Sequence, residues 1–232
     1  MASKLETTFQ AINARIVQAS DRAGRDVSEV TLIAVTKSVD AETTEAVCRL
    51  GVKQIAENRQ QVASDKLPYV PALQAEDRPQ LVFIGPLQRN KTRKVMESFD
   101  EIQSVDNLKL AETINRIAAE DGLKYAVWIQ FNVANEDQKG GFDVSDADEI
   151  AKQFSALANL NIKGLMCMAP YGSEPEAARP YFKQLAQLSK RLIEEGKLPD
   201  SANGLSMGMS GDFEVAIEEG ATHVRVGSAL YR

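Results

Sequence analysis

A lysine follows an apolar segment near the start of the chain. Residues 31–36 read Thr-Leu-Ile-Ala-Val-Thr, and Lys37 stands directly after them. A run of branched apolar residues is typical of a parallel strand covered on both faces, and α/β folds bind ligands at the carboxyl ends of such strands. Partial burial there favours the neutral amine, which attacks carbonyl carbons to form Schiff bases. The segment alone is explained equally well by a lysine that only ends the strand and extends into solvent.

Two loops near the other end of the chain have the composition of a phosphate-binding site. The sequence Ser-Met-Gly-Met-Ser-Gly-Asp occupies residues 206–212, and Gly227 and Ser228 follow the last apolar segment. Backbone N–H groups and the hydroxyls of Ser210 and Ser228 suit a phosphate, which barrels commonly bind after strands seven and eight. Each loop alone is explained by an ordinary turn. The carboxylate of Asp212 already complements the dipole of the following helix, which argues mildly against a second anion there. Together, and opposite a strand-end lysine, the two loops favour a phosphate site.

One arginine interrupts the last apolar segment, His-Val-Arg-Val-Gly at residues 223–227. An unpaired charge inside such a strand is costly, and strand alternation places Arg225 on the same side as Gly227, facing the interior. A buried ion pair with Asp or Glu is the structural explanation, and a contact with a ligand's ring nitrogen or carboxylate is the functional one. An arginine beside a pyridine nitrogen would keep that nitrogen unprotonated. His223, the only histidine of the chain, is predicted to be structural.

The elements that must position these residues alternate regularly along the chain. Strands are expected over residues 31–37, 53–58, 81–87, 101–106, 125–132, 162–169, 204–209 and 223–230, and a helical pattern follows each strand but the last. Repeated βα units predict a parallel sheet, and their number and the chain length match a (β/α)8 TIM barrel. A doubly wound open sheet is the alternative. An additional N-terminal helix over residues 4–22 is expected to fill the outer position after the last strand, where we expect no helix.

Composition excludes several classes of function. The 232 residues are 44% apolar and 26% charged, as in an ordinary soluble domain, and the net charge of −6 is spread along the chain, which argues against nucleic-acid binding. No run reaches the roughly 20 apolar residues of a membrane span, and the N-terminus lacks a signal sequence, so we expect a cytoplasmic protein. Cys48 and Cys167 lack metal-binding or redox spacing, and no metal site is expected. One domain is expected to span residues 1–232.

Several segments together resemble the pyridoxal phosphate homeostasis family. They are Leu-Ile-Ala-Val-Thr-Lys (32–37), Glu-Asn (57–58), Phe-Ile-Gly-Pro-Leu-Gln-Arg-Asn-Lys (83–91), Ser-Met-Gly-Met-Ser (206–210) and Val-Arg-Val-Gly-Ser (224–228). The match runs in order from about residue 4 to the end of the chain, so it is far more specific than any single motif.

The resemblance implies a barrel like the N-terminal domain of alanine racemase that holds pyridoxal 5′-phosphate (PLP) as a Schiff base on Lys37. It further implies that the phosphate is held by Ser210, Gly227 and Ser228, that Arg225 faces the pyridine nitrogen, and that Asn58 and Met209 line the ring. The implied function is PLP homeostasis without an established catalytic reaction, with apo forms of PLP-dependent enzymes as possible recipients. We expect a monomer.

The chain departs from the family pattern at the position two residues after the Schiff-base lysine, where Val39 replaces a frequent second lysine. Lys139 is therefore the candidate second lysine. Two other functions compete with a PLP carrier. A PLP-dependent amino-acid racemase would need a second, β-rich domain and a partner's catalytic tyrosine. A cofactor-free aldolase would need carboxylates at strand ends, where Asp106 is the only one found.

Overall fold

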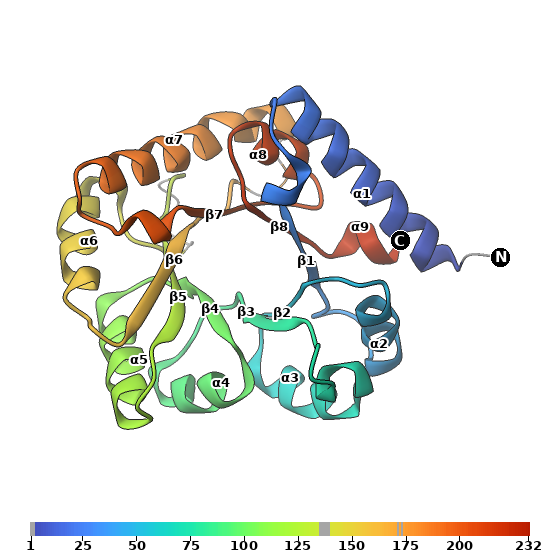
Figure 1. Cartoon of the computed structure of the whole chain (residues 1–232), viewed down its shortest axis with the longest axis horizontal. Helices are drawn as coiled ribbons and strands as arrows, with labels where there is room; N and C mark the ends of the chain where they lie inside the picture. The colour runs from blue at the N-terminus through green and yellow to red at the C-terminus, as the bar shows by residue number, and fades with distance from the viewer. Residues whose placement is uncertain (1–2, 135–139, 171, 173) are drawn as a thin grey trace.

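Eight parallel strands close into a barrel in the computed structural model, which describes residues 3–134, 140–170, 172 and 174–232 (Figure 1). The strands are β1 (Thr31–Val35), β2 (Gln54–Glu57), β3 (Gln80–Phe83), β4 (Glu101–Val105), β5 (Tyr125–Gln130), β6 (Leu160–Met166), β7 (Gly204–Met209) and β8 (His223–Val226). They follow one another in chain order, and β8 pairs with β1, where Ile33 lies opposite Arg225. The predicted (β/α)8 barrel is confirmed, and the open-sheet alternative is wrong.

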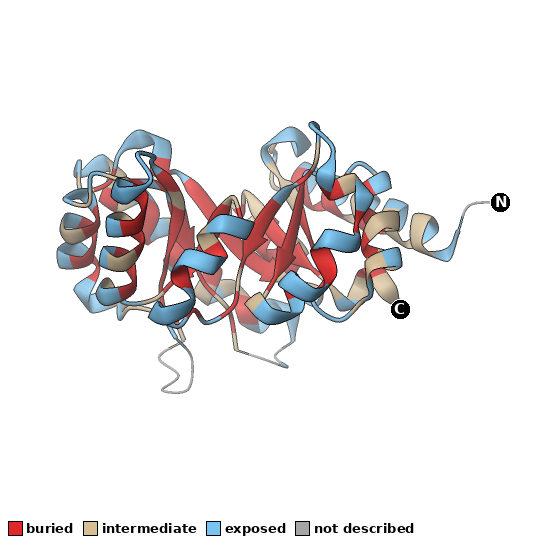
Figure 2. Cartoon of the chain, turned by 90° about the horizontal axis from the view of Figure 1, so that it is seen from below, coloured by how far each residue is buried: buried red, intermediate tan, exposed pale blue. Residues whose placement is uncertain are grey.

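Helices form the outer layer around these strands. They are α1 (Lys4–Arg22), α2 (Ala41–Arg49), α3 (Gln60–Lys66), α4 (Thr92–Ser98), α5 (Leu108–Glu120), α6 (Ala147–Ser155), α7 (Pro175–Glu194), α8 (Phe213–Glu218) and α9 (Ser228–Tyr231). Figure 2 shows the buried strands at the centre and exposed residues on the outer faces of the helices. None of the helices within the described ranges has both the length and the hydropathy needed to cross a bilayer.

Side-chain caps and glycines set the ends of several helices. Asp40 Oδ1 accepts the Thr43 N–H at 2.8 Å before α2, and Asn107 Oδ1 accepts the Leu110 N–H at 2.9 Å before α5. These carboxylate and amide oxygens satisfy backbone donors that have no partner within the helix. Gly51 and Gly122 follow the same two helices with φ of +80° and +67°, a conformation that glycine adopts without steric strain. These caps and glycines thus fix the residues at which α2 and α5 begin and end.

The N-terminal helix occupies the outer ring beside β8 and β1, where it packs against α8 and α9 (Figure 1). Arg15 of this helix pairs with Glu214 of α8 at 2.7 Å, and Arg25 Nη1 donates to the carbonyl of Ile217 at 3.0 Å. The expected position is therefore confirmed. The expectation of no helix after the last strand is wrong, because β8 ends at Val226 and the single turn of α9 follows it. One turn is too short to produce a periodic pattern that separates it from the preceding strand.

Alternate residues of the strands face the barrel interior and the surrounding helices. Ile33, Val35, Ala56 and Val82 form a small buried cluster of their own, whereas the intervening residues belong to the larger core shared with the helices. Since neighbouring residues in paired parallel strands face the same side, Arg225 opposite Ile33 faces the interior, as predicted. The barrel interior therefore contains an arginine beside an apolar cluster.

Candidate functional site

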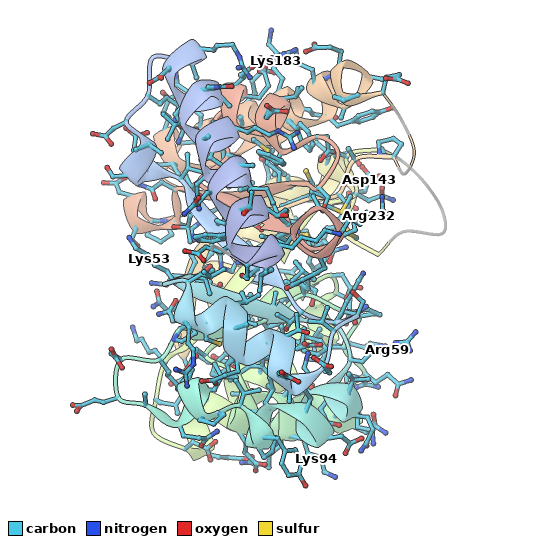
Figure 3. All side chains as sticks on the ribbon, turned by 90° about the vertical axis from the view of Figure 1, so that its right-hand side faces the viewer. Lys53, Arg59, Lys94, Asp143, Lys183 and Arg232 are labelled. Atoms are coloured by element: carbon cyan, nitrogen blue, oxygen red, sulfur yellow. The ribbon has the colours of Figure 1, made fainter. Side chains whose placement is uncertain are left out.

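The seven predicted ligand-binding residues gather at one mouth of the barrel, on the neighbouring strands β7, β8, β1 and β2 or directly after them. They are Met209, Ser210, Arg225, Gly227, Ser228, Lys37 and Asn58. Figure 3 shows the two mouths: Lys53, just before β2, lies on one side, and Arg59, just after β2, lies on the other side with Arg232. Residues from both ends of the chain meet there because the barrel closes between β1 and β8.

Lys37 lies in the turn that follows β1, and its side chain is exposed. The partial burial expected for this lysine is wrong, because β1 ends at Val35, two residues before the end of the strand predicted over residues 31–37. Thr36 is fully buried, and its carbonyl accepts the Val39 N–H at 3.1 Å to close the turn. The amine therefore projects from a closed backbone turn into solvent.

Asn58 follows β2 at the neighbouring strand end and is partly buried. Gly85 packs directly on its backbone, since a Cβ at Gly85 would overlap the carbonyl oxygen of Asn58. Any larger residue at Gly85 would push the end of β3 away from the end of β2. The absence of a side chain at Gly85 therefore allows the chain after β3 to pack against the end of β2 at this mouth.

The two small-residue loops are joined through one hydroxyl. Ser210 Oγ accepts the N–H groups of Gly227 and Ala229 at 3.1 and 3.3 Å, which brings the loop after β7 onto the start of α9. Asp212, rather than Ser210, is the N-cap residue of α8, and it makes no side-chain cap bond. Its Oδ1 instead accepts the Met209 N–H at 2.5 Å. The predicted phosphate loops therefore meet, while Asp212 stabilises the first of them.

Asp212 has an altered protonation equilibrium at this mouth. Burial raises the pKa of its carboxyl group, whereas the Met209 N–H and the positive charge of Arg225 act in the opposite direction. The carboxyl group thus interacts with the loop after β7 and with the buried guanidinium.

Arg225 is 3% exposed and makes two short hydrogen bonds inside the barrel. Its Nη1 donates to Ser206 Oγ at 2.6 Å, and its Nη2 donates to the Cys167 carbonyl at 2.8 Å. In the part of the chain that the structure describes, the guanidinium forms no ion pair with a carboxylate, so the structural alternative of a buried ion pair is not found. Burial lowers the pKa of this arginine. A buried guanidinium held by neutral groups is free to face a polar ligand atom.

A polar chain continues from Arg225 through the barrel interior. Ser206 Oγ donates to Gln103 Oε1 at 2.6 Å, and Gln103 Nε2 donates to Glu101 Oε1 at 2.8 Å. Burial raises the pKa of Glu101 at the far end of this chain. Glu101 and Gln103 alternate along β4, and this alternation of polar residues within a strand is the sequence signal for polar groups that face the barrel interior.

His223 lies at the amino end of β8, away from the mouth that carries Lys37. Its ring packs edge-on against Trp128 with the centroids 4.8 Å apart, and Nδ1 lies 2.8 Å from Thr222 Oγ1. Burial, followed by the positive charges of Arg225 and Lys163, lowers the pKa of the imidazole to about 4. The neutral, packed ring supports the structural role predicted for it.

Acid is expected to weaken the fold through this histidine. The imidazole has a pKa near 6.5 when unfolded and about 4 when folded, so the unfolded chain binds the extra proton and stability falls as pH falls from 6.5 to 4. The loss amounts to about 2–3 kcal/mol. We expect urea unfolding of His223→Gln to lack this part of the pH dependence. Parallel stability profiles for the two proteins would contradict the assignment.

Cys48 and Cys167 are both buried and neither forms a disulfide bond, and burial raises the pKa of the Cys48 thiol to about 11. Over the described residues, no group of three His, Cys, Asp or Glu side chains is placed to hold a metal ion. Lys139 lies outside the described residues.

Comparisons with known proteins agree on one family. The family model described as "Alanine racemase, N-terminal domain" matches residues 8–232. A pyridoxal phosphate homeostasis protein from Aquifex aeolicus is 38% identical over 217 residues, which cover 94% of this chain and 92% of the relative. The structure of PipY from Synechococcus elongatus with PLP bound is 34% identical, with a TM-score of 0.80 over 95% of this chain and 100% of PipY.

More distant structures share the barrel alone. The alanine racemase of Clostridium difficile is 13% identical, with a TM-score of 0.66 over 94% of this chain and 56% of the racemase. This similarity supports a common fold, and an identity this low carries no argument for a common activity. The close relatives, in contrast, match along nearly their whole length. The chain therefore belongs to the pyridoxal phosphate homeostasis protein family.

Proposed function

We propose that this protein binds PLP and serves in its homeostasis, holding the cofactor as a Schiff base on Lys37. The observation that carries the proposal is the meeting of three features at one mouth. An exposed lysine, two joined small-residue loops and a buried arginine without a carboxylate partner in the described structure lie on, or directly after, three neighbouring strands, β7, β8 and β1. A relative of this family, PipY, is described with PLP bound, which supports the same ligand here.

The residues at the mouth fit the parts of PLP. The hydroxyls of Ser210 and Ser228 suit the phosphate, because small residues let phosphate oxygens approach. The backbone N–H of Gly227 would join them by leaving Ser210 Oγ, to which it donates in this structure. Arg225 would face the pyridine nitrogen, and Asn58 and Met209 would line the ring. A positive guanidinium beside that nitrogen disfavours its protonation and so limits the ring's capacity as an electron sink.

Covalent attachment requires the neutral amine of Lys37. Its nitrogen would bond to the aldehyde carbon of PLP, and the aldehyde oxygen would leave as one molecule of water. The reverse reaction consumes one water molecule and releases the aldehyde. Because Lys37 projects into solvent, water and a recipient have access to the linkage from outside.

We propose a carrier rather than an enzyme, and the names of the close relatives support this choice. The racemase alternative rests on the shared barrel, and the 13% identity to a racemase carries no argument for the activity. The protein would act as a cytoplasmic monomer formed by one PLP-binding domain over residues 1–232. Apo forms of PLP-dependent enzymes would receive the cofactor.

Reduction of the protein–PLP complex with borohydride tests the attachment. We expect a visible absorption band after addition of PLP, its loss on reduction, and a phosphopyridoxyl label on the peptide that contains Lys37. Peptide mapping by mass spectrometry identifies the labelled lysine. A label on another residue would contradict the assignment of Lys37, and no band at saturating PLP would contradict Schiff-base formation itself.

A further inference from the structure

A second lysine near the mouth is buried, although it stands in a polar helix. Lys66, the last residue of α3, is 8% exposed. Its Nζ donates to Glu57 Oε1 at 2.5 Å, to the Thr36 carbonyl at 2.7 Å and to the Val39 carbonyl at 3.3 Å. The ammonium group has three protons, and each has one of these acceptors.

The two carbonyls belong to the first and last residues of the turn that carries Lys37. The Val39 N–H also donates to the Thr36 carbonyl at 3.1 Å, so the turn is closed by its own backbone and held at both ends by Lys66. Hydrogen bonds from an ionised donor are stronger than those between neutral groups. One buried ammonium group therefore restrains the backbone on both sides of the proposed Schiff-base lysine.

The carboxylate of Glu57 completes this buried group. Glu57 is fully buried at the end of β2, and its Oε1 accepts both the Lys66 ammonium and the Thr36 hydroxyl, the latter at 2.6 Å. Its other oxygen, Oε2, is buried and makes no hydrogen bond among the described residues. A buried ion pair seldom stabilises a fold more than apolar side chains of similar volume would. Its geometry here points to a positional role.

We infer that Lys66 and Glu57 are positioning residues that hold the 36–39 turn so that the Lys37 amine reaches the PLP aldehyde. The inference rests on the proposed function. The exposed side chain of Lys37 has four flexible bonds, so the orientation of its backbone decides how often the amine meets a bound aldehyde. Ser210, Gly227 and Ser228 follow other strands, β7 and β8, so we expect capture of the phosphate to depend less on the turn than covalent attachment does.

The test separates capture of PLP from formation of the covalent bond. The double variant Lys66→Met/Glu57→Gln removes the ammonium and leaves no unpaired buried charge. Stopped-flow absorbance over a range of PLP concentrations gives a half-saturating concentration and a limiting first-order rate constant. We expect the limiting rate constant to fall about 10- to 100-fold, with the half-saturating concentration changed less than about 2-fold, because misplacement by about 1 Å slows reactions on this scale.

Arg78→Met provides a matched control at the opposite mouth. Arg78 pairs with Asp100 at 2.7 Å just before β3 and β4, so its loss removes an ion pair without touching the 36–39 turn. We expect the control to keep the wild-type rate constant. An unchanged rate constant in the double variant, or an equal fall in the control, would overturn the inference while Schiff-base formation on Lys37 stands. Absence of a Schiff base in the wild type would overturn the proposed function itself.

Discussion

Replacement of Lys37 by alanine is expected to abolish the Schiff base and to weaken PLP binding by about 100-fold or more. The variant keeps both phosphate-type loops and Arg225, so weak non-covalent binding should remain. The side chain is exposed and forms no part of the core, so the fold should be unchanged. Equilibrium dialysis gives the dissociation constant, and the absence of a visible band with no label after borohydride reports the loss of the linkage.

Lys53→Ala is the control for this experiment. Lys53 is also exposed, and it lies at the opposite mouth, before β2 (Figure 3). We expect PLP binding and the label on Lys37 to be unaffected by its loss. If Lys37→Ala bound PLP as tightly as the wild type, the result would contradict the proposed site, because PLP would be bound without a contribution from Lys37.

Replacement of Lys66 alone by methionine is expected to destabilise the protein by about 3–5 kcal/mol. The substitution leaves the carboxylate of Glu57 buried with only the Thr36 hydroxyl as a partner. The double variant Lys66→Met/Glu57→Gln should recover most of this loss, because a neutral amide still accepts the hydroxyl and no buried charge remains. Urea unfolding of the cofactor-free proteins at neutral pH measures the four free energies of this cycle.

The Arg78→Met variant again gives the scale for comparison. Arg78 and Asp100 are each about one-third exposed, so breaking their pair should lower stability by only about 1 kcal/mol. Additive losses in the Lys66 and Glu57 cycle would show that the two residues are energetically independent and would contradict a coupled buried pair. A loss of unfolding free energy for Lys66→Met no larger than that for Arg78→Met would also contradict a coupled buried pair.

The barrel and the meeting of the candidate residues were predictable from the sequence. Apolar runs separated by capped helical patterns indicate parallel strands, and the carboxyl ends of such strands lie on one edge. Lys37, Asn58, Ser210 and Gly227 therefore come together once the sheet closes. The inward direction of Arg225 followed from the alternation of side chains along the apolar segment at residues 223–227, in which Arg225 and Gly227 share one side.

The supporting contacts could not be predicted in the same way. Lys66 ends the polar sequence Gln-Gln-Val-Ala-Ser-Asp-Lys, in which a lysine has the character of a surface residue, yet tertiary packing buries it against β1 and β2. The exposure of Lys37 depends on where β1 stops, and the residue types after Val35 do not show whether the strand includes Thr36 and Lys37 or the turn begins there. Hydrogen bonds between Arg225, Ser206 and Gln103 join distant strands and leave no pattern in local sequence.

Closure of β8 on β1 also determines the stage of synthesis and folding at which the site is complete. Contacts such as that between Arg25 and the Ile217 carbonyl join residues 192 positions apart. Contacts of that separation form late, because a long stretch of chain must first be ordered. A nascent chain on the ribosome therefore displays Lys37 early but lacks its phosphate loops until β8 has emerged. Under the proposed function, competence for the cofactor would be acquired with β8, so products truncated before it would carry the Lys37 amine without the loops that give it specificity.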